Sequence, residues 1–208
     1  MELKNKSLFK EECFIDGKWI KSFSGETINV DNPATLKTIG TVPKCGQEET
    51  RYAITKANEA WGKWRAKSSK DRSIILRNWN NLILENKDDL AHIMTVEQGK
   101  PITESRGEII YGASFVEWFA EEAKRVYGDI IPDRLTDRRI IIIKQPVGIV
   151  GAITPWNFPS SMITRKCAPA LAVGCPVVIK PASQTPFSAL ALAKLADQAG
   201  FPKGTINV

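Results

Sequence analysis

The chain has 208 residues, a net charge of +6, 43% hydrophobic and 25% charged residues, which are values of a globular protein. No apolar run approaches the ~20 residues of a membrane span. The polar N-terminus MELKNKSLFK has no signal-peptide core, so we expect a cytoplasmic protein without a membrane partner. Basic residues are mostly interleaved with acids, and no nucleic-acid-binding motif accompanies them, so we expect a solvated face and no nucleic-acid partner. The positive balance favours acidic small molecules.

Metal and disulfide chemistry is not indicated either. The four cysteines Cys13, Cys45, Cys167 and Cys175 form no CxxC pair, and His92 is the single histidine. We therefore expect no metal site, and no structural disulfide in a cytosolic chain. Cys167 and Cys175 lie among apolar residues, where a thiol is usually inert packing rather than a nucleophile.

The first hundred residues predict two short β-hairpins followed by helices. Residues 13–20 alternate around Asp16-Gly17, a hairpin turn signal. Residues 26–30 and 36–42 read as further strands, and residues 47–65 as a long amphipathic helix. Ser68 begins an S-x-x-D capping pattern for the next helix, and residues 88–97 continue helical until Gly99-Lys100-Pro101.

Residues 103–127 predict a fourth helix, whose Phe115, Trp118 and Phe119 we expect in the core. Residues 138–144 are different, because four consecutive isoleucines lie between basic residues. Such a strand has little preference for one face. Periodicity alone allows it to be a fully buried strand of the main sheet.

The segment 145–183 predicts a strand–helix–strand unit. Residues 148–154 and 176–180 are short apolar, β-branched runs, and a helix of about residues 161–173 lies between them. Such a unit implies parallel neighbouring strands, beyond whose carboxyl ends open α/β sheets bind ligands. Thr185-Pro186 then starts a helix that Gly200 ends, and residues 205–208 begin a third strand.

The sequence TPWNFP at 154–159, followed by RK, PALA and KPAS, resembles the aldehyde dehydrogenase superfamily. Within it, EQGKP at 97–101, residues 114–132, MITRK at 162–166 and residues 180–193 resemble the succinate-semialdehyde dehydrogenases. The likeness covers about residues 8–208. It implies an α/β, aldehyde-dehydrogenase-like fold, with N-terminal helices and the first half of a Rossmann-like parallel sheet.

The resemblance also implies an incomplete enzyme, because family members are more than twice as long. We expect the nucleophilic cysteine, the glutamate base and a second glycine-rich loop beyond residue 208, and no turnover by this chain alone. Residues 1–132 would form the N-terminal hairpins and helices, and residues 133–145 a strand of a projecting sheet that pairs subunits. Residues 146–208 would form half of the dinucleotide-binding unit, with the catalytic domain absent. The complete parent would be a homo-oligomer, a tetramer or a dimer.

The cofactor is expected to be NADP, with NAD possible. No GxGxxG is present, so the resemblance rather than the usual fingerprint supports a dinucleotide site. Lys180 matches a lysine that binds ribose oxygens in the family, and the resemblance implies the same role here. NAD-preferring sites place an acid against the ribose hydroxyls, and its charge repels the 2′-phosphate of NADP. This chain has Ser183 in the KPAS segment instead, and a hydroxyl does not repel that phosphate. The expected cofactor-binding residues are Thr154, Pro155, Trp156, Asn157, Lys180, Pro181, Ala182 and Ser183.

Asn157 is the expected catalytic residue. By resemblance its amide stabilises the oxyanion that forms on the substrate carbonyl. The alternative from the sequence alone is a helix N-cap, since asparagine often caps a following helix.

Arg165 is the expected substrate-binding residue. The matching family arginine grips the distal carboxylate of succinate semialdehyde, and a guanidinium suits that group. A surface or ion-paired arginine is the alternative.

The resemblance therefore implies oxidation of succinate semialdehyde to succinate with NADP. Another semialdehyde such as glutarate semialdehyde, or a non-catalytic fragment, remains open.

Overall fold

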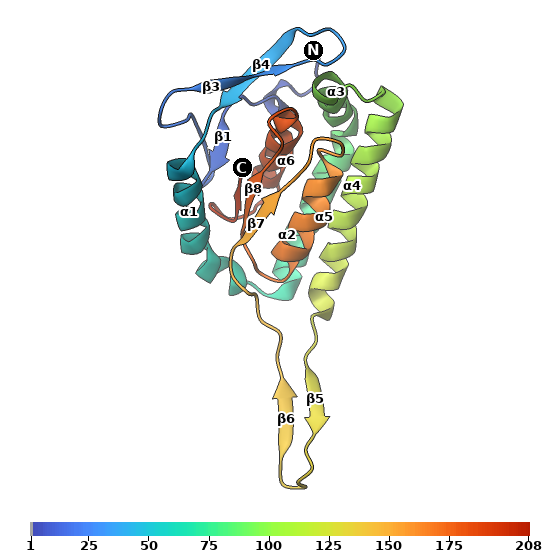
Figure 1. Cartoon of the computed structure of the whole chain (residues 1–208). Helices are drawn as coiled ribbons and strands as arrows, with labels where there is room; N and C mark the ends of the chain where they lie inside the picture. Colours follow the sequence, from blue (N-terminus) through green and yellow to red (C-terminus); the bar gives the residue numbers. More distant parts are fainter. Residues whose placement is uncertain (1) are drawn as a thin grey trace.

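A computed structural model describes residues 2–208 of the chain (Figure 1). A 3-10 turn, Lys6–Leu8, precedes two hairpins, β1 (Cys13–Ile15) with β2 (Lys18–Ile20) and β3 (Thr27–Asp31) with β4 (Thr38–Pro43). The first hairpin turns at Asp16 and Gly17, which have φ values of 55° and 70°. Positive φ at both turn positions is what a two-residue hairpin needs, so the turn prediction is confirmed.

The helices follow in the predicted order. They are α1 (Gln47–Arg65), α2 (Ser69–Glu85), α3 (Lys87–Gln98) and α4 (Ile102–Glu122). Ser68 caps α2, because its Oγ accepts a hydrogen bond from the Asp71 N–H at 3.1 Å. Gly99 ends α3 with φ 85°, and a Cβ there would come within 2.9 Å of Pro33. Both the cap and the stop were predicted correctly.

The helix predicted for α4 was too long, and its three aromatic side chains are only partly in the core as expected. The helix ends at Glu122 and continues as a 3-10 turn, Ala123–Arg125. Trp118 is 64% exposed, while Phe115 and Phe119 are half-buried. The buried face consists mainly of small or β-branched residues, which let α4 approach its neighbours closely: Ser105, Ile109, Gly112, Ala113, Val116 and Ala120. Phe119 packs against the edge of the core, as predicted, whereas the prediction for Trp118 was wrong.

A parallel sheet occupies the C-terminal third. The strands β7 (Val150–Ile153), β8 (Val177–Lys180) and β9 (Ile206–Asn207) are adjacent in that order. They are joined by α5 (Ser161–Ala172) and α6 (Pro186–Ala199). β1 lies beside β9, since the N–H of Phe14 and the N–H of Val208 each donate to the other's carbonyl. The α/β fold with half of a Rossmann-like sheet is confirmed.

One core joins the N-terminal helices to the parallel sheet unit. The indole N–H of Trp64 donates to the Leu171 carbonyl at 3.2 Å, and that of Trp79 donates to the Leu192 carbonyl at 3.1 Å. The ring of Phe201 packs against both indoles, with centroids 5.4 and 5.7 Å away. The N-terminal helices and the parallel sheet unit therefore share a single hydrophobic interior.

A two-stranded hairpin projects from this body (Figure 1). It consists of β5 (Asp129–Pro132) and β6 (Arg139–Ile142), which pair antiparallel. All eight strand residues are exposed, so the fully buried alternative for the isoleucine run is wrong. The hairpin begins at Asp129, inside the segment that we assigned to the N-terminal part. Its role in pairing subunits stays a prediction.

None of the helices in residues 2–208 is long and apolar enough to cross a membrane.

Candidate functional site

Two loops leave the parallel sheet at the same edge. Ile153, the last residue of β7, lies opposite Lys180, the last residue of β8. The N–H of Thr154 donates to the Lys180 carbonyl at 3.2 Å, which extends the pairing by one bond. The loops 154–157 and 180–183 therefore start side by side, at the carboxyl ends of the strands, where open α/β sheets bind ligands.

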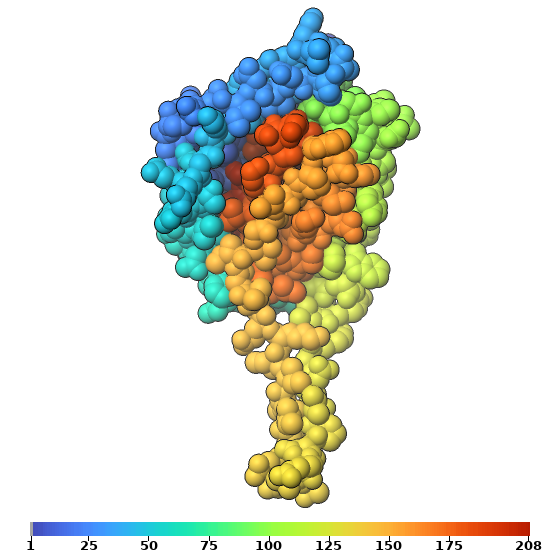
Figure 2. All heavy atoms as spheres, in the orientation of Figure 1, coloured from blue at the N-terminus to red at the C-terminus, as the bar shows by residue number. Residues whose placement is uncertain are grey.

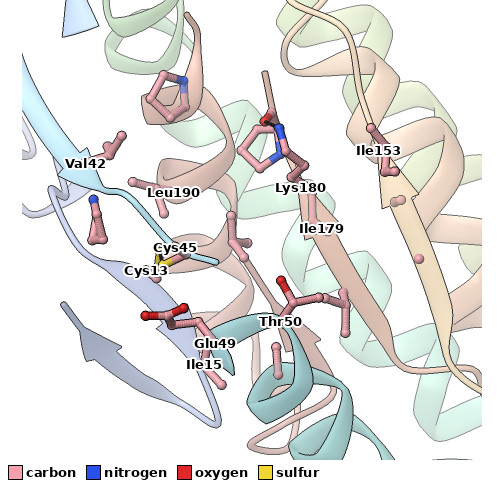
Figure 3. Close-up of a pocket in the computed structure, with 18 of the residues that line it drawn as sticks. Cys13, Ile15, Val42, Cys45, Glu49, Thr50, Ile153, Ile179, Lys180 and Leu190 are labelled. Atoms are coloured by element: carbon pink, nitrogen blue, oxygen red, sulfur yellow. Dashed lines mark hydrogen bonds between the residues drawn. The ribbon is translucent and has the colours of Figure 1, made fainter. Parts of the chain in front are cut away.

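A pocket of about 490 Å³ opens beside the second loop (Figure 3). Lys180, Pro181, Ala182 and Ser183 line it, together with apolar side chains of the sheet and of the N-terminal hairpins and helix. Residues 154–157 are not among its lining residues. Figure 2 shows this face of the molecule, with the N-terminal segments in blue and cyan on one side and β7 in orange on the other. The structure thus places half of the expected cofactor residues on the pocket wall.

Lys180 is exposed rather than buried, although its strand is mostly buried. Its ammonium group lies 3.4 Å from the Pro181 carbonyl and forms no salt bridge within residues 2–208. Lys180 needs no carboxylate partner, because the strand ends at this residue and its side chain reaches solvent. Its positive charge is therefore free to meet an anionic ligand.

Glu49 is the single carboxylate among the residues that line the pocket. Its two oxygens accept hydrogen bonds from the N–H groups of Phe23 and Gly46, both at 2.7 Å. These backbone donors lower the pKa of the Glu49 carboxyl below its ordinary value. At position 183 the pocket presents an exposed serine hydroxyl, so no acid stands beside Lys180 on its own loop.

A buried ion pair holds the loop that carries Asn157. The Lys100 ammonium donates to Glu108 Oε2 at 2.5 Å, and these side chains are 10% and 2% exposed. The same ammonium donates to the Asn157 carbonyl at 3.1 Å and lies 4.1 Å from the centre of the Phe158 ring. The backbone of the Asn157 loop is therefore held by Lys100, in the connection between α3 and α4, while the Asn157 side chain is left exposed.

Glu108, not Asn157, caps α5. Its Oε1 accepts from the N–H groups of Ser160 and Ser161, at 3.0 and 3.1 Å. Helix N-termini leave such donors without intrahelical partners, so a carboxylate there is stabilising. The capping alternative for Asn157 is wrong, and its amide stays available to a ligand.

A second buried carboxylate caps α6. The oxygens of Glu97 accept from the N–H groups of Phe187 and Ser188, at 2.7 and 2.8 Å. Burial raises the pKa of the Glu97 carboxyl to about 8, against the opposing effect of these donors. Glu97 and Lys100 both belong to the EQGKP segment. This segment therefore contacts α6, which follows the Lys180 loop, and also the backbone of the Asn157 loop. The sequence alone assigned no role to these two residues. The feature that could have indicated one is the cluster of charged residues at the end of a buried helix.

Arg165 lies on α5, the helix that follows the Asn157 loop. It is exposed, its guanidinium lies 5.2 Å from the centre of the Phe115 ring, and it forms no salt bridge within residues 2–208. Gly112 of α4 faces this helix closely, since a Cβ there would come within 3.2 Å of the Thr164 hydroxyl. Among the described residues the ion-paired alternative for Arg165 is thus wrong, whereas its exposure agrees with the alternative of a surface arginine.

Comparison with known proteins decides the family. The model of the aldehyde dehydrogenase family matches residues 19–208. The chain belongs to this family. It is 59% identical, over its whole length, to the glutarate-semialdehyde dehydrogenase of Pseudomonas aeruginosa and also to the NADP(+) succinate-semialdehyde dehydrogenase GabD of Escherichia coli. It covers 43% of each of those proteins. A crystal structure of an E. coli NADP dependent enzyme superposes with a TM-score of 0.99 at 58% identity, with 100% of this chain and 43% of that chain covered.

Aldehyde dehydrogenase chemistry needs a reactive thiol, and the two buried cysteines do not supply one. Cys167 and Cys175 are 0% and 1% exposed, and burial raises the pKa of the Cys167 thiol to about 12. A nucleophilic cysteine needs a lowered pKa and access. Both are therefore packing residues. Within residues 2–208, no group of histidine, cysteine and acidic side chains is arranged to hold a metal ion.

Proposed function

We propose that this chain is the N-terminal, cofactor-binding part of a dehydrogenase that oxidises an aldehyde with a distal anionic group, using NADP. The observation that carries the proposal is the common edge of β7 and β8, where the Asn157 loop and the Lys180 loop start side by side. The relatives support the substrate class, because the names of three of them specify succinate semialdehyde, glutarate semialdehyde and 3-sulfolactaldehyde. Each of these aldehydes carries a carboxylate or a sulfonate.

NADP fits the residues of the second loop. When bound, it supplies the nicotinamide that accepts a hydride from the substrate. The Lys180 ammonium group forms no salt bridge within residues 2–208 and could meet ribose or phosphate oxygens. The Ser183 hydroxyl can donate to a 2′-phosphate without repelling it. The backbone of Pro181 and Ala182 forms the adjoining wall of the pocket. Thr154, Pro155 and Trp156 would border the cofactor from the first loop.

We assign to Asn157 the stabilisation of negative charge on the substrate oxygen. An amide donor is effective there only if its position is fixed before the reaction. The Lys100 contact with the Asn157 carbonyl supports this role, because it holds the backbone while the side chain stays exposed. The cysteine nucleophile and the glutamate base are not assigned to any of the described residues, and we expect no turnover from this chain alone.

Arg165 would bind the distal anion of the substrate. Its guanidinium is exposed, is stacked over Phe115 and has no carboxylate partner in the described chain. A planar fork of donors binds a carboxylate in bidentate fashion. It serves succinate and glutarate semialdehyde alike, so we propose the carboxylated semialdehydes as the class and succinate semialdehyde as the first substrate to test.

The test is Arg165→Ala in the complete dehydrogenase that contains this segment. We expect the Michaelis constant for succinate semialdehyde to rise roughly tenfold to hundredfold, since a charged hydrogen bond contributes about 1.5–3 kcal/mol. The Michaelis constant for an uncharged aldehyde should change little. Arg165→Lys should restore part of the apparent affinity for succinate semialdehyde. Lys166→Ala is the matched control, because it removes the neighbouring exposed cation. Equal losses for both aldehydes would contradict the substrate assignment while leaving the dehydrogenase activity in place.

A further inference from the structure

Cys13 and Cys45 lie together although 32 positions separate them in the sequence. Their Sγ atoms are 3.4 Å apart, close enough for one thiol to donate a hydrogen bond to the other. Cys13 begins β1, and Cys45 stands in the segment between β4 and α1. Figure 3 shows both side chains meeting on the wall of the pocket that Lys180 lines.

We propose that Cys13 and Cys45 are a reversible redox pair that forms a disulfide by exchange with glutathione disulfide. A disulfide needs its sulfur atoms about 2.05 Å apart, so the contact must shorten by little more than one ångström. Cys45 is exposed and Cys13 is half-buried, so a small disulfide in solution reaches Cys45 first.

The two thiols are also unequal in acidity. The hydrogen bond from Cys13 lowers the pKa of the Cys45 thiol, while the pKa of the Cys13 thiol is raised by the same bond and by burial. The nearby Glu49 carboxylate opposes ionisation of both. Because the thiolate is the attacking species in exchange, Cys45 is the entry point and Cys13 the resolving thiol.

The exchange balances in two steps. The Cys45 thiolate attacks one sulfur of glutathione disulfide, forms a mixed disulfide and releases one glutathione thiolate. Cys13 then loses its proton and attacks Cys45 Sγ, which releases the second glutathione. Two electrons pass from the cysteines to glutathione disulfide, and the two thiol protons end on two glutathione molecules.

The bond would join two parts of the pocket wall. β1 is hydrogen-bonded to β9 through Phe14 and Val208, and Cys45 immediately precedes Gly46, the N-cap of α1. Both elements face the cavity that contains Lys180 and Ser183. Oxidation would therefore fix the start of α1 to the edge of the sheet, whereas the reduced pair leaves the two segments linked only by noncovalent contacts.

The test counts thiols in the purified 208-residue chain after equilibration with mixtures of glutathione and glutathione disulfide, followed by alkylation. Of the four thiols in the reduced chain, we expect two to be lost in the monomer and regained with excess glutathione. Peptide mapping should join the peptides of Cys13 and Cys45. Cys45→Ser should keep its remaining thiols free, and Cys13→Ser should accumulate a mixed disulfide at Cys45.

The buried cysteines provide the matched controls. Cys167→Ala and Cys175→Ala should each still lose two thiols on oxidation, because neither side chain contributes to the pair. Four free thiols at every glutathione ratio would overturn the proposal, as would a disulfide that joins other cysteines or two chains. This test does not depend on dehydrogenase activity, so its outcome is independent of the proposed function.

Discussion

At the scale of single residues, we predict that cofactor choice depends on the charge at position 183. Ser183 is exposed on the loop that lines the pocket. In the proposed cofactor site, a carboxylate at this position would repel a 2′-phosphate, whereas the serine hydroxyl would not. A carboxylate about 4 Å from a phosphate is disfavoured by roughly 4 kcal/mol per unit charge pair at an effective dielectric of 20, and solvent screening leaves less.

We therefore expect Ser183→Glu to shift the ratio of kcat/KM for NADP over NAD at least tenfold towards NAD in the complete dehydrogenase. Ser183→Ala is the control, because it removes the hydroxyl without adding charge and should change the ratio much less. If the ratio is the same in Ser183→Glu and in the parent, cofactor choice resides in residues other than Ser183.

The buried pair of Lys100 and Glu108 gives a second prediction at this scale. Lys100→Met would leave the Glu108 carboxylate buried without its cation, which typically costs about 3–5 kcal/mol. We expect a loss of that order in the free energy of unfolding, measured with urea on the 208-residue chain. Lys124→Met is the control, since Lys124 and Glu121 form an exposed pair worth about 0–1 kcal/mol. Equal losses in the two variants would show that Lys100 does not hold the Asn157 loop.

At the scale of elements, local patterns predicted helices well where the signal lies within the helix. The bounds of α1 match the predicted range of residues 47–65, because a long amphipathic pattern specifies its own buried face. Thr185 was predicted to start α6 and does stand at the N-cap, but its side chain makes no capping bond. The cap comes from Glu97, which lies 90 positions before Phe187, whose N–H it accepts, and no local pattern indicates such a partner.

The same limit applied to the candidate site. Both loops were predicted at the carboxyl ends of their strands, since each follows a short β-branched run. The contacts of Lys100 with Glu108 and with the Asn157 carbonyl depend on how α3 and α4 pack against the sheet unit. The strand β5 was missed because its Ile130-Ile131 pair directly follows a helical pattern, and only its pairing with β6 makes it a strand.

The start of α1 predicts a pH dependence of stability. Backbone donors lower the pKa of Glu49 in the folded chain below its ordinary value of 4.5. Between the two values the unfolded chain binds more protons, so the contribution of Glu49 is present above pH 4.5 and is lost as the pH falls through the folded pKa. We expect Glu49→Gln to flatten the fall in unfolding free energy below pH 4.5. Glu48→Gln, at the exposed neighbour, should leave that fall unchanged; a curve for Glu49→Gln that parallels the parent would contradict this account.

At the scale of the whole molecule, the projecting hairpin exposes apolar side chains that do not pack against the rest of the chain. Ile130 and Ile141 are cross-strand partners and are each 70% exposed. Large exposed apolar patches on soluble proteins mark interaction sites. The backbone edges of a two-stranded sheet also offer unpaired N–H and C=O groups to another strand. These features are the physical support for the predicted role of the hairpin in pairing subunits.

The corresponding prediction is that replacing Ile130 and Ile141 together by lysine lowers the oligomeric state of the complete dehydrogenase. Two charges on a buried interface would remain without partners, whereas on a free hairpin they are solvated, so the body should keep its unfolding temperature. Sedimentation measures the first effect and calorimetry at matched protein concentration the second. Ile74→Lys is the control, because Ile74 is 49% exposed on α2, outside the hairpin. A double variant that sediments like its parent would mean that the hairpin lies outside the subunit contact, and its exposed isoleucines would then have to serve another surface.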